Sequence, residues 1–376
     1  MTRRIVYVSG TRAEFGLMEG VLHLLHQRED VELKIIPTGM HLSGIYGNTI
    51  GDIRDSGLNI AVTIPVLSDE GTGAATAVAL GRLLIELVPA LQRLDPDAVL
   101  ITGDRGEMLA TALAAAHLNT HIFHVHGGER SGTLDESIRH AISKISHYHL
   151  VATEESKNRL TRMGERSDRT WVTGAPGIDD LYSATIIERS GLFRRVGFDP
   201  ERATVLLLYH PVLMSCEEAG LEFSEILEGV MQQSCQVLCL MPNSDGGSNL
   251  IRKEIQGIDS SSVIVRTHMP RLEYLSWMMN VDAIVGNSSS GIIEAASFGT
   301  PVINVGPRQN LRERNRNVVD IGVDSAQVSH AISNAKKHGK FERLNIYGDG
   351  LASHRIVKLV AETQLLKDDL YKANTY

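Results

Sequence analysis

Short apolar runs alternate with amphipathic stretches along most of this chain, and this alternation is the feature that most constrains its fold. Each run is bounded by loop residues, as is typical of a buried parallel strand. In the first half the predicted strands are Arg4–Ser9, Glu32–Pro37, Ala98–Thr102, His121–Val125 and Tyr148–Ala152. Apolar residues at helical spacing predict helices at Glu14–His26, Ala74–Leu94, Glu107–His117 and Asp135–Ser146. Such an order predicts a doubly wound parallel sheet with right-handed crossovers.

A second series of the same kind begins after Val172–Asp179. Its predicted strands are Thr204–Tyr209, Gln236–Met241, Val263–Arg266, Asp282–Val285 and Pro301–Val305. A chain of 376 residues is long enough for two domains, and glycine and proline near 174–177 mark the crossing point. We therefore predict an α/β fold with two Rossmann-like domains, residues 1–175 and 176–352, and a cleft between them. Residues 353–376 form a terminal segment with a helix at Ser353–Leu370.

Composition narrows the classes of partner. The net charge is −8 and only 5% of residues are aromatic, which argues against nucleic-acid binding. The three cysteines, Cys216, Cys235 and Cys239, lack metal-ligand spacing, and their odd number indicates reduced thiols. No uninterrupted apolar run approaches about 18 residues, and no secretory signal opens the chain. We expect a cytoplasmic protein that contacts neither nucleic acid nor membrane.

Two polar clusters follow predicted strands in the first domain. GDRGEM at Gly103–Met108 follows one strand, and HVHGGERSGTLDESIRH at His124–His140 continues from the next. Ligands of open α/β sheets bind at the carboxyl ends of the strands, so these clusters predict an active site. Because carboxylates and imidazoles transfer protons, the expected chemistry is acid–base catalysis.

A metal site is a weaker interpretation of the same residues. His124, His126, Glu129 and Asp135 include possible ligands, but their spacing is not typical of zinc or iron sites. We expect neither a metal nor a cofactor.

Two glycine-rich turns favour an anionic ligand. In SGTRAEFG (Ser9–Gly16), Gly10 permits close approach of the backbone to a ligand, and Arg12 can pair with a phosphate. The alternative is a plain turn with a surface arginine. In GNSSSGIIEAASFG (Gly286–Gly299), small residues open a helix, and the Glu294 carboxylate suits a ribose diol. The alternative is a set of serines that only cap the helix. The second pattern favours a nucleotide diphosphate site.

His210, in the YHP sequence Tyr209–Pro211, stands at the exit of a predicted strand. We expect it to face the cleft, where a histidine is as often structural as catalytic.

Taken together, these motifs resemble the UDP-N-acetylglucosamine 2-epimerase family, and within it the hydrolysing branch that feeds sialic acid synthesis. The resemblance also rests on TGMHL, YGNT, PNSDGG and GTPVINVGPRQ, all in family order, at Thr38–Leu42, Tyr46–Thr49, Pro242–Gly247 and Gly299–Gln309. It implies the glycosyltransferase-B architecture, with the terminal helix returning to the N-terminal domain. We expect a homodimer or a dimer of dimers.

The resemblance also implies a reaction. Family members remove the C2 proton of a UDP-sugar and expel UDP from C1, leaving a 2-acetamidoglucal. The hydrolysing branch then adds water at C1 and reprotonates C2 from the other face, which yields N-acetylmannosamine and UDP. Such chemistry requires a positioned base and cationic stabilisation of the departing diphosphate.

Residue roles follow from matching positions in the family. Asp104 and Asp135 match acid/base residues, Arg139 would orient Asp135 from one helical turn away, and His210 lies near the leaving group. The resemblance places His268 in the uracil pocket. It also assigns a set of residues to substrate and UDP binding: Arg12, Arg105, Ser288, Ser289, Ser290, Gly291, Glu294 and Arg308.

One departure from the family pattern concerns the proton-transferring group. Many members have HIEGGE, with a catalytic glutamate at the third position, whereas this chain has HVHGGE with His126 there. Either His126 or Glu129 takes over the proton transfer, and we favour His126 because it keeps the strand position.

Three alternatives stay open. The same chemistry could act on UDP-N,N′-diacetylbacillosamine, which differs at C4 and C6 of the sugar. A glycosyltransferase of this fold or a sugar-nucleotide sensor would need no C2 base.

The apolar helix at Ala74–Leu94 is either a dimer face or a buried core helix.

Overall fold

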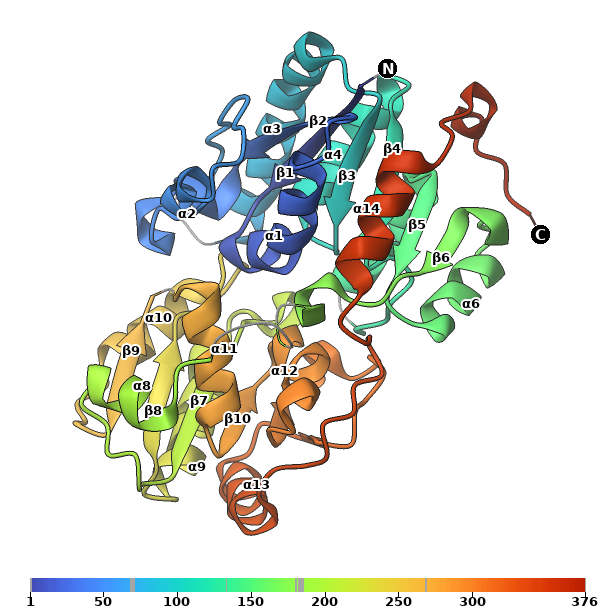
Figure 1. The fold of residues 1–376 in the computed structure, drawn as a ribbon. Coiled ribbons are helices and arrows are strands. Elements are labelled where there is room, and N and C mark those ends of the chain that lie inside the picture. Colours follow the sequence, from blue (N-terminus) through green and yellow to red (C-terminus); the bar gives the residue numbers. More distant parts are fainter. Residues whose placement is uncertain are drawn as a thin grey trace.

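Two α/β domains, each built on one six-stranded parallel sheet, make up the molecule (Figure 1). The structure is a computed structural model that describes residues 2–67, 72–132, 134–179, 181, 186–267 and 269–375. The predicted fold class is confirmed: the strands alternate with helices, all pairings are parallel, and the second series forms its own sheet. Parallel sheets need helices on both faces, which the amphipathic stretches supply.

The N-terminal sheet has the strand order β2-β1-β3-β4-β5-β6. Its strands are β1 (Arg3–Ser9), β2 (Val31–Pro37), β3 (Ala98–Thr102), β4 (His121–Val125), β5 (Tyr148–Val151) and β6 (Thr170–Val172). The helices are α1 (Arg12–His26), α2 (Ile50–Asp55), α3 (Gly73–Leu94), α4 (Gly106–His117), α5 (Leu134–Ile145) and α6 (Glu154–Arg162).

The C-terminal sheet has the order β12-β11-β10-β7-β8-β9. Its strands are β7 (Thr204–Leu208), β8 (Gln236–Leu240), β9 (Val263–Arg266), β10 (Ala283–Gly286), β11 (Val302–Val305) and β12 (Val318–Ile321). The helices are α8 (Arg189–Arg195), α9 (Ala219–Met231), α10 (Ser248–Gln256), α11 (Arg271–Asn280), α12 (Ser289–Ile293) and α13 (Ser325–His338).

Two edge strands, β6 and β12, were not predicted from the sequence. β6 has three residues, and β12 exposes its two central residues, so neither forms the continuous apolar run of a buried strand. They belong to the sheets because their backbones pair with β5 and β11.

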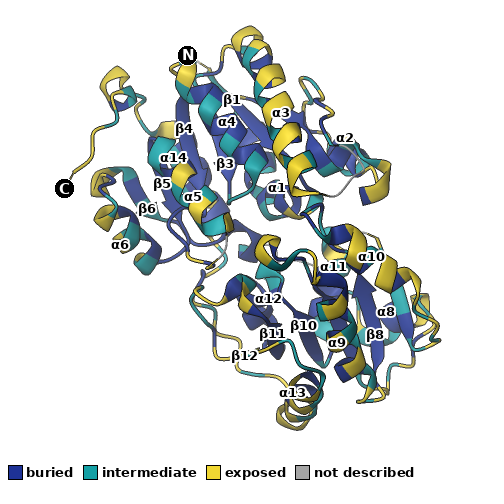
Figure 2. Ribbon diagram, turned by 180° about the vertical axis from the view of Figure 1, so that it is seen from behind, coloured by how far each residue is buried: buried dark blue, intermediate teal, exposed yellow. Residues whose placement is uncertain are grey.

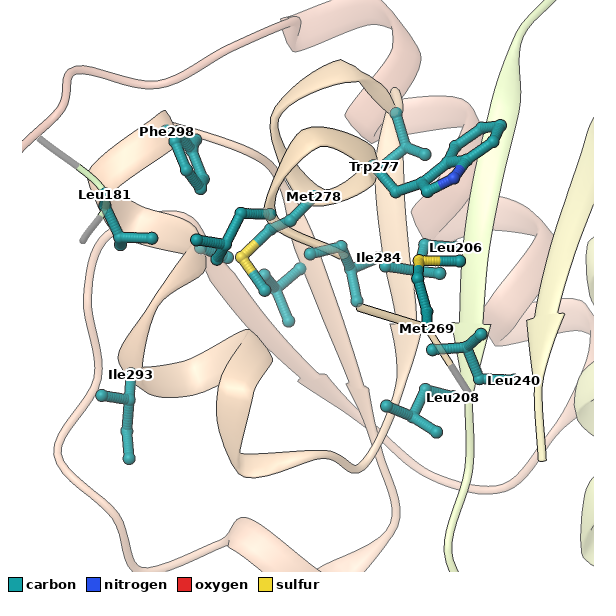
Figure 3. Packing of buried hydrophobic residues seen from close by; sticks show 14 of the residues in the cluster. Leu181, Leu206, Leu208, Leu240, Met269, Trp277, Met278, Ile284, Ile293 and Phe298 are labelled. Atoms are coloured by element: carbon teal, nitrogen blue, oxygen red, sulfur yellow. The ribbon is translucent and has the colours of Figure 1, made fainter. Parts of the chain in front are cut away.

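Apolar clusters on both faces of each sheet form the cores of the two domains. On one face of the C-terminal sheet, Trp277, Met278 and Phe298 pack with Ile284 (Figure 3). Leu208, Leu240 and Met269 lie at one end of this cluster and also line the cavity between the domains. The core therefore supplies part of the cavity wall.

Helix α14 (Ala352–Glu362) returns to the N-terminal domain and lies against α1, as the resemblance implied (Figure 1). Its residues Ile356 and Val360 join the core formed with β1 and β3. The predicted helix Ser353–Leu370 is too long, since α14 ends at Glu362 and only a short 3-10 turn, Lys367–Leu370, follows. The Arg3 guanidinium donates to the carbonyl oxygens of Val360 and Thr363 and satisfies this helix end.

Helix α3 is half core and half surface. Ala79, Leu83 and Leu87 pack against the N-terminal sheet, whereas Val78 and Ile85 are exposed on the outer side (Figure 2). In the part of the chain that the structure describes, α3 is the one helix long and apolar enough to cross a membrane by length and composition. A helix of a soluble core passes the same test, so the cytoplasmic, membrane-free location stays a prediction.

The strand orders fix where a ligand can bind. Strand order reverses between β1 and β3 in the first sheet and between β10 and β7 in the second. In open parallel sheets, loops at the carboxyl ends of the strands beside such a reversal form the binding crevice. These loops carry the predicted motifs SGTRAE, GDR, YHP and GNSSSG.

Candidate active site

A cavity of about 320 Å³ lies between the two domains. The N-terminal domain contributes residues of the loops after β1, β3 and β4, and the C-terminal domain contributes residues after β7 and β10. The predicted residues on its wall are Arg12, Asp104, Arg105, His126, Glu129, Arg139, His210, Ser288, Ser289, Ser290, Glu294 and Arg308. Residues predicted from motifs nearly 300 positions apart thus share one cavity.

His126 and Glu129 form a buried pair after β4. The His126 Nδ1–H donates to Glu129 Oε1 at 2.6 Å, so Nε2 carries the ring's free lone pair. Within the described residues, this buried Nε2 has no hydrogen-bond partner. Burial, with the Arg312 charge, lowers the pKa of His126 to about 4, which keeps the ring neutral near pH 7. The neutral ring thus presents an oriented Nε2 lone pair to the cavity, where it can accept a hydrogen bond or a proton from a ligand.

The backbone of His126 is unusual in its own right. Its φ of 63° lies in the left-handed region, which a residue with a Cβ rarely adopts. Such a conformation persists where the surroundings hold it, and it is frequent at active sites. Here it turns the chain sharply from β4 into the Gly127–Gly128 loop and keeps Glu129 close to the imidazole.

Asp104 is held by arginines from both domains. Arg139 on α5 donates to Asp104 Oδ2 through Nη2 and to the Glu129 carbonyl through Nη1, the latter at 2.9 Å. Arg312, from the C-terminal domain, lies 3.9 Å from Asp104 Oδ2 and also pairs with Glu129 Oε2. Two guanidinium groups favour the ionised carboxylate, which can therefore act as a base.

The predicted contact between Arg139 and Asp135 is wrong. Arg139 points to Asp104, whereas Asp135 pairs with Arg308 across the cleft at 3.4 Å. Asp135 lines a neighbouring second cavity rather than the first. Both side chains lie on α5, but Arg139 finds its partners in loops of its own domain, whereas Asp135 finds its partner in the opposite domain.

His210 points into the first cavity from the end of β7. Its Nδ1 accepts the backbone N–H of Asn243 at 3.1 Å, so the proton of the neutral ring is on Nε2. Burial lowers the pKa of His210 to about 3. A neutral ring of this tautomer can donate a hydrogen bond from Nε2 to an oxygen atom of a ligand.

The serine loop after β10 is not a conventional helix cap. Ser288 occupies the N-cap position of the five-residue helix α12 but makes no side-chain capping bond. Its hydroxyl instead pairs with that of Ser290, which also contacts the Tyr274 hydroxyl at 2.5 Å. Gly291, predicted to bind substrate, does not line the cavity; it packs against β11, where an added Cβ would lie 3.1 Å from Val302.

Two further predicted residues already have charged partners. Glu294 forms a buried ion pair with Arg271 at 2.6 Å, and Arg271 also donates to the Gly177 carbonyl. Arg12 contacts Asp52 at 2.5 Å. Both residues line the cavity, so a ligand would meet paired groups there.

The sequence analysis missed Arg271 and Arg312, which contact the predicted acids. Neither is in a recognised motif, although Arg312 stands four residues after Arg308.

His268 lies outside the described residues, so its predicted place beside uracil is untested. Across the described ranges, no three His, Cys, Asp or Glu residues are arranged to hold a metal ion. Metal-free and cofactor-free catalysis stays a prediction.

Comparison with known proteins identifies the family. Residues 23–361 match the family described as UDP-N-acetylglucosamine 2-epimerase. The chain belongs to the UDP-N-acetylglucosamine 2-epimerase family. This match covers most of both domains and most of α14, and it confirms the family named from the motifs.

Members of the family differ in the substrate that their names give. A relative from Legionella pneumophila, "UDP-N,N'-diacetylbacillosamine 2-epimerase (hydrolyzing)", is 46% identical over all of both chains. A relative from Neisseria meningitidis, "UDP-N-acetylglucosamine 2-epimerase", is 32% identical over 93% of this chain and 91% of its own.

The fold of this family member also matches a solved structure. The crystal structure of the UDP-GlcNAc 2-epimerase from Neisseria meningitidis bound to UDP-GlcNAc has a TM-score of 0.79, at 20% identity. The match covers 96% of this chain and 100% of that chain. At this identity the likeness supports the architecture of two domains around a cleft.

Proposed function

We propose that this enzyme is a hydrolysing 2-epimerase, which converts a UDP-linked 2-acetamido sugar and water into UDP and the free 2-epimeric sugar. The observation that carries the proposal is the His126–Glu129 pair, whose neutral imidazole has a free Nε2, in the same cavity as the carboxylate Asp104. Family membership and the two named relatives support the same reaction class.

In the proposed first step, the Asp104 carboxylate takes the C2 proton. The C2–H electron pair forms the C1=C2 double bond, and the C1–O pair leaves with UDP. Arg139 and Arg312 position Asp104. The Nε2–H of His210 and the charge of Arg308 stabilise the departing diphosphate by hydrogen bonding and attraction, with no proton transferred.

In the second step, a water molecule passes a proton to His126 Nε2. The resulting imidazolium, held by Glu129, delivers that proton to C2 on the face opposite the one from which the first proton left, and the C1=C2 electron pair forms the new C2–H bond. The hydroxide that remains from the water bonds to the electron-deficient C1. Asp104 then releases its proton to solvent. One proton leaves C2 and one is delivered to C2. His126 transfers the second proton, and Glu129 orients its ring, so the two residues act together and are not alternatives.

Nucleotide recognition is assigned to the C-terminal domain and the β1–α1 turn. Ser288, Ser289 and Ser290 offer hydroxyl groups to the diphosphate, Arg12 adds charge, and Glu294 is placed for the ribose diol. Gly291 is not part of this assignment, because it packs against β11.

The sugar substituents distinguish two candidate substrates. UDP-N-acetylglucosamine, the substrate expected from the sialic acid branch, is supported by the name of the 32% identical relative. UDP-N,N′-diacetylbacillosamine is supported by the name of the 46% identical relative. The greater identity over the full chain favours the second sugar.

Solvent deuterium tests the reaction. Each UDP-sugar is incubated with the enzyme in D₂O, and the products are followed by NMR. We expect release of UDP with one deuterium at C2 of a free sugar of inverted configuration. An Asp104→Asn variant should lose about 10²-fold in kcat. Free sugar without deuterium at C2, or no free sugar at all, would contradict the proposal.

A further inference from the structure

A second cavity of about 320 Å³ adjoins the first. The two share Asp104, Arg105 and Arg308, so one catalytic carboxylate faces both. The second cavity lies between the N-terminal ends of α3, α4 and α5 and the loop that follows β7. It thus extends the active site away from the serine loop, which belongs to the first cavity alone.

The two ends of this second cavity differ in chemistry. Apolar side chains from both domains line one end: Leu67, Leu80, Ile138, Val212, Leu213 and Met214. Met214 is 90% exposed, an unusual state for a large apolar side chain on a cavity wall.

The other end is a row of ion pairs across the cleft. Arg105 lies 3.5 Å from Asp245, and Arg308 lies 3.4 Å from Asp135 and 3.8 Å from Asp245. This row separates the apolar end from the nucleotide side of the first cavity. A molecule that fits must be polar where it reaches the acids and apolar beyond them.

We propose that the second cavity is the subsite for the C4 and C6 substituents of the sugar, and that it selects a 4-acylamino-6-deoxy sugar over one with hydroxyl groups at C4 and C6. The inference rests on the proposed function. With the diphosphate at the serine loop and C2 at Asp104, the remainder of the sugar ring extends away from the diphosphate. The second cavity begins at Asp104 on that side.

The C4 and C6 substituents of the diacetamido sugar match the apolar side chains that line the second cavity. An acetamido group at C4 and a methyl group at C6 each present a methyl to apolar side chains, and one buried methyl changes kcat/KM by about tenfold or more. Hydroxyl groups at the same positions would lose water without gaining partners from leucine, valine or methionine side chains.

Competing sugars test the subsite directly. Values of kcat/KM for UDP-N,N′-diacetylbacillosamine and UDP-N-acetylglucosamine are compared in wild type, Leu80→Gln and Met214→Gln. Leu221→Gln is the matched control, since Leu221 is 74% exposed on α9 and lines neither cavity. We expect wild type to prefer the diacetamido sugar by at least about tenfold, and each cavity variant to lose most of that preference.

The accompanying readouts separate this role from a structural one. UDP affinity should stay within about threefold of wild type in both cavity variants, kcat/KM should fall for the diacetamido sugar but not for UDP-N-acetylglucosamine, and the control should keep the full preference. Equal losses for both sugars, or a wild-type preference for UDP-N-acetylglucosamine, would overturn the subsite. If Leu80→Gln does not fold, the exposed Met214→Gln decides. Release of UDP from neither sugar would overturn the proposed function as well, whereas release from both without preference overturns the subsite alone.

Discussion

A single imidazole, that of His126, combines burial, a fixed tautomer and an available lone pair. Glu129 accepts a hydrogen bond from its Nδ1–H, and the backbone of His126 is left-handed. The two residues that the sequence offered as alternatives are therefore one unit, in which Glu129 orients the imidazole and stabilises its protonated form.

Substitution of this pair should separate the base from its positioning residue. We expect His126→Gln to lower kcat by about 10²-fold or more, because a glutamine cannot accept and return a proton. Glu129→Gln should lower kcat less, since an amide oxygen can still accept from Nδ1. Steady-state kinetics and UDP titration provide the measurements, with UDP affinity retained in both variants. Near wild-type turnover in His126→Gln, with Glu129→Gln inactive, would assign the proton transfer to Glu129.

His124 illustrates how a buried histidine makes stability depend on pH. Its Nε2–H donates to the Gly103 carbonyl at 2.8 Å, and its Nδ1 pairs with the Ser143 hydroxyl. Burial lowers the pKa of His124 to about 3, from an ordinary value of 6.5. Between these two values the unfolded chain binds the extra proton, so the stability of the native state falls as pH falls.

His124→Gln should reduce this dependence, because glutamine does not titrate. Urea unfolding at several pH values between 4.5 and 6, roughly the middle of that window, provides the free energy of unfolding. We expect the wild-type slope against pH to exceed that of His124→Gln by about 1.4 kcal/mol per pH unit. His23→Gln is the control, since His23 is on the surface of α1. Equal slopes in wild type and His124→Gln would show that His124 does not contribute.

At the scale of elements, the β10–α12 loop contains serines that are typical of a helix cap, yet the Ser288 side chain at the N-cap position makes no capping hydrogen bond. Helix α12 has only five residues, and the Ser288 and Ser290 hydroxyls pair with each other while the loop lines the cavity. The serine cluster is thus available to a ligand, and its loss should cost binding rather than stability.

Ser288→Ala, at the N-cap position of α12, is the variant that tests this view. We expect the Kd for UDP to rise about tenfold, the effect of one lost hydrogen bond to a charged group. The melting temperature without ligand should change by no more than about 1 °C, whereas a lost helix cap would cost about 1 kcal/mol. Isothermal titration and thermal unfolding measure the two quantities. A clear loss of stability with unchanged UDP affinity would favour the capping role.

At the scale of the whole molecule, ion pairs across the cleft connect the two domains. Arg312 meets Asp104 and Glu129, Arg308 meets Asp135, and Arg105 meets Asp245. Each pair joins one domain to the other. We expect closure of the cleft to bring Arg308 and Arg312 of the C-terminal domain against the acids of the N-terminal domain.

Removal of Arg312 should open the molecule. We expect Arg312→Ala to increase the radius of gyration of the free enzyme in small-angle scattering, and UDP to restore compaction in part. Arg314→Ala is the control, because Arg314 pairs with Asp320 inside the C-terminal domain. An unchanged radius of gyration in Arg312→Ala, with or without UDP, would argue against closure through these pairs.

The exposed side of α3 bears on assembly. Val78 and the 70% exposed Ile85 lie on a helix whose other side is in the core. The core interpretation of this helix holds for its inner side, and we expect the exposed side to pair with a second copy of the chain. Ile85→Glu should convert a dimer to a monomer in light scattering, while Leu344→Glu, on an exposed loop, should not. A wild-type monomer would contradict this expectation.

Much of the architecture could be predicted because it depends on local patterns. The ten predicted strands all exist, since buried parallel strands have continuous apolar sequences. The edge strands β6 and β12 could not be predicted, because their pairing comes from the neighbouring strand rather than from their own side chains. The end of α14 depends on Arg3, some 350 residues away, and no local signal marks it.

The sequence by itself determined the family, the fold class and the loops that carry the chemistry, because motifs at the carboxyl ends of parallel strands must converge. The tertiary structure alone decided which groups meet. Arg139 pairs with Asp104 instead of Asp135, Arg271 pairs with Glu294 inside the C-terminal domain, and Arg312 pairs with Glu129 of the opposite domain. The reason is physical: ion pairs form between side chains that the packing of elements and domains brings within reach, and the spacing of residues along one helix does not encode which other elements pack against it.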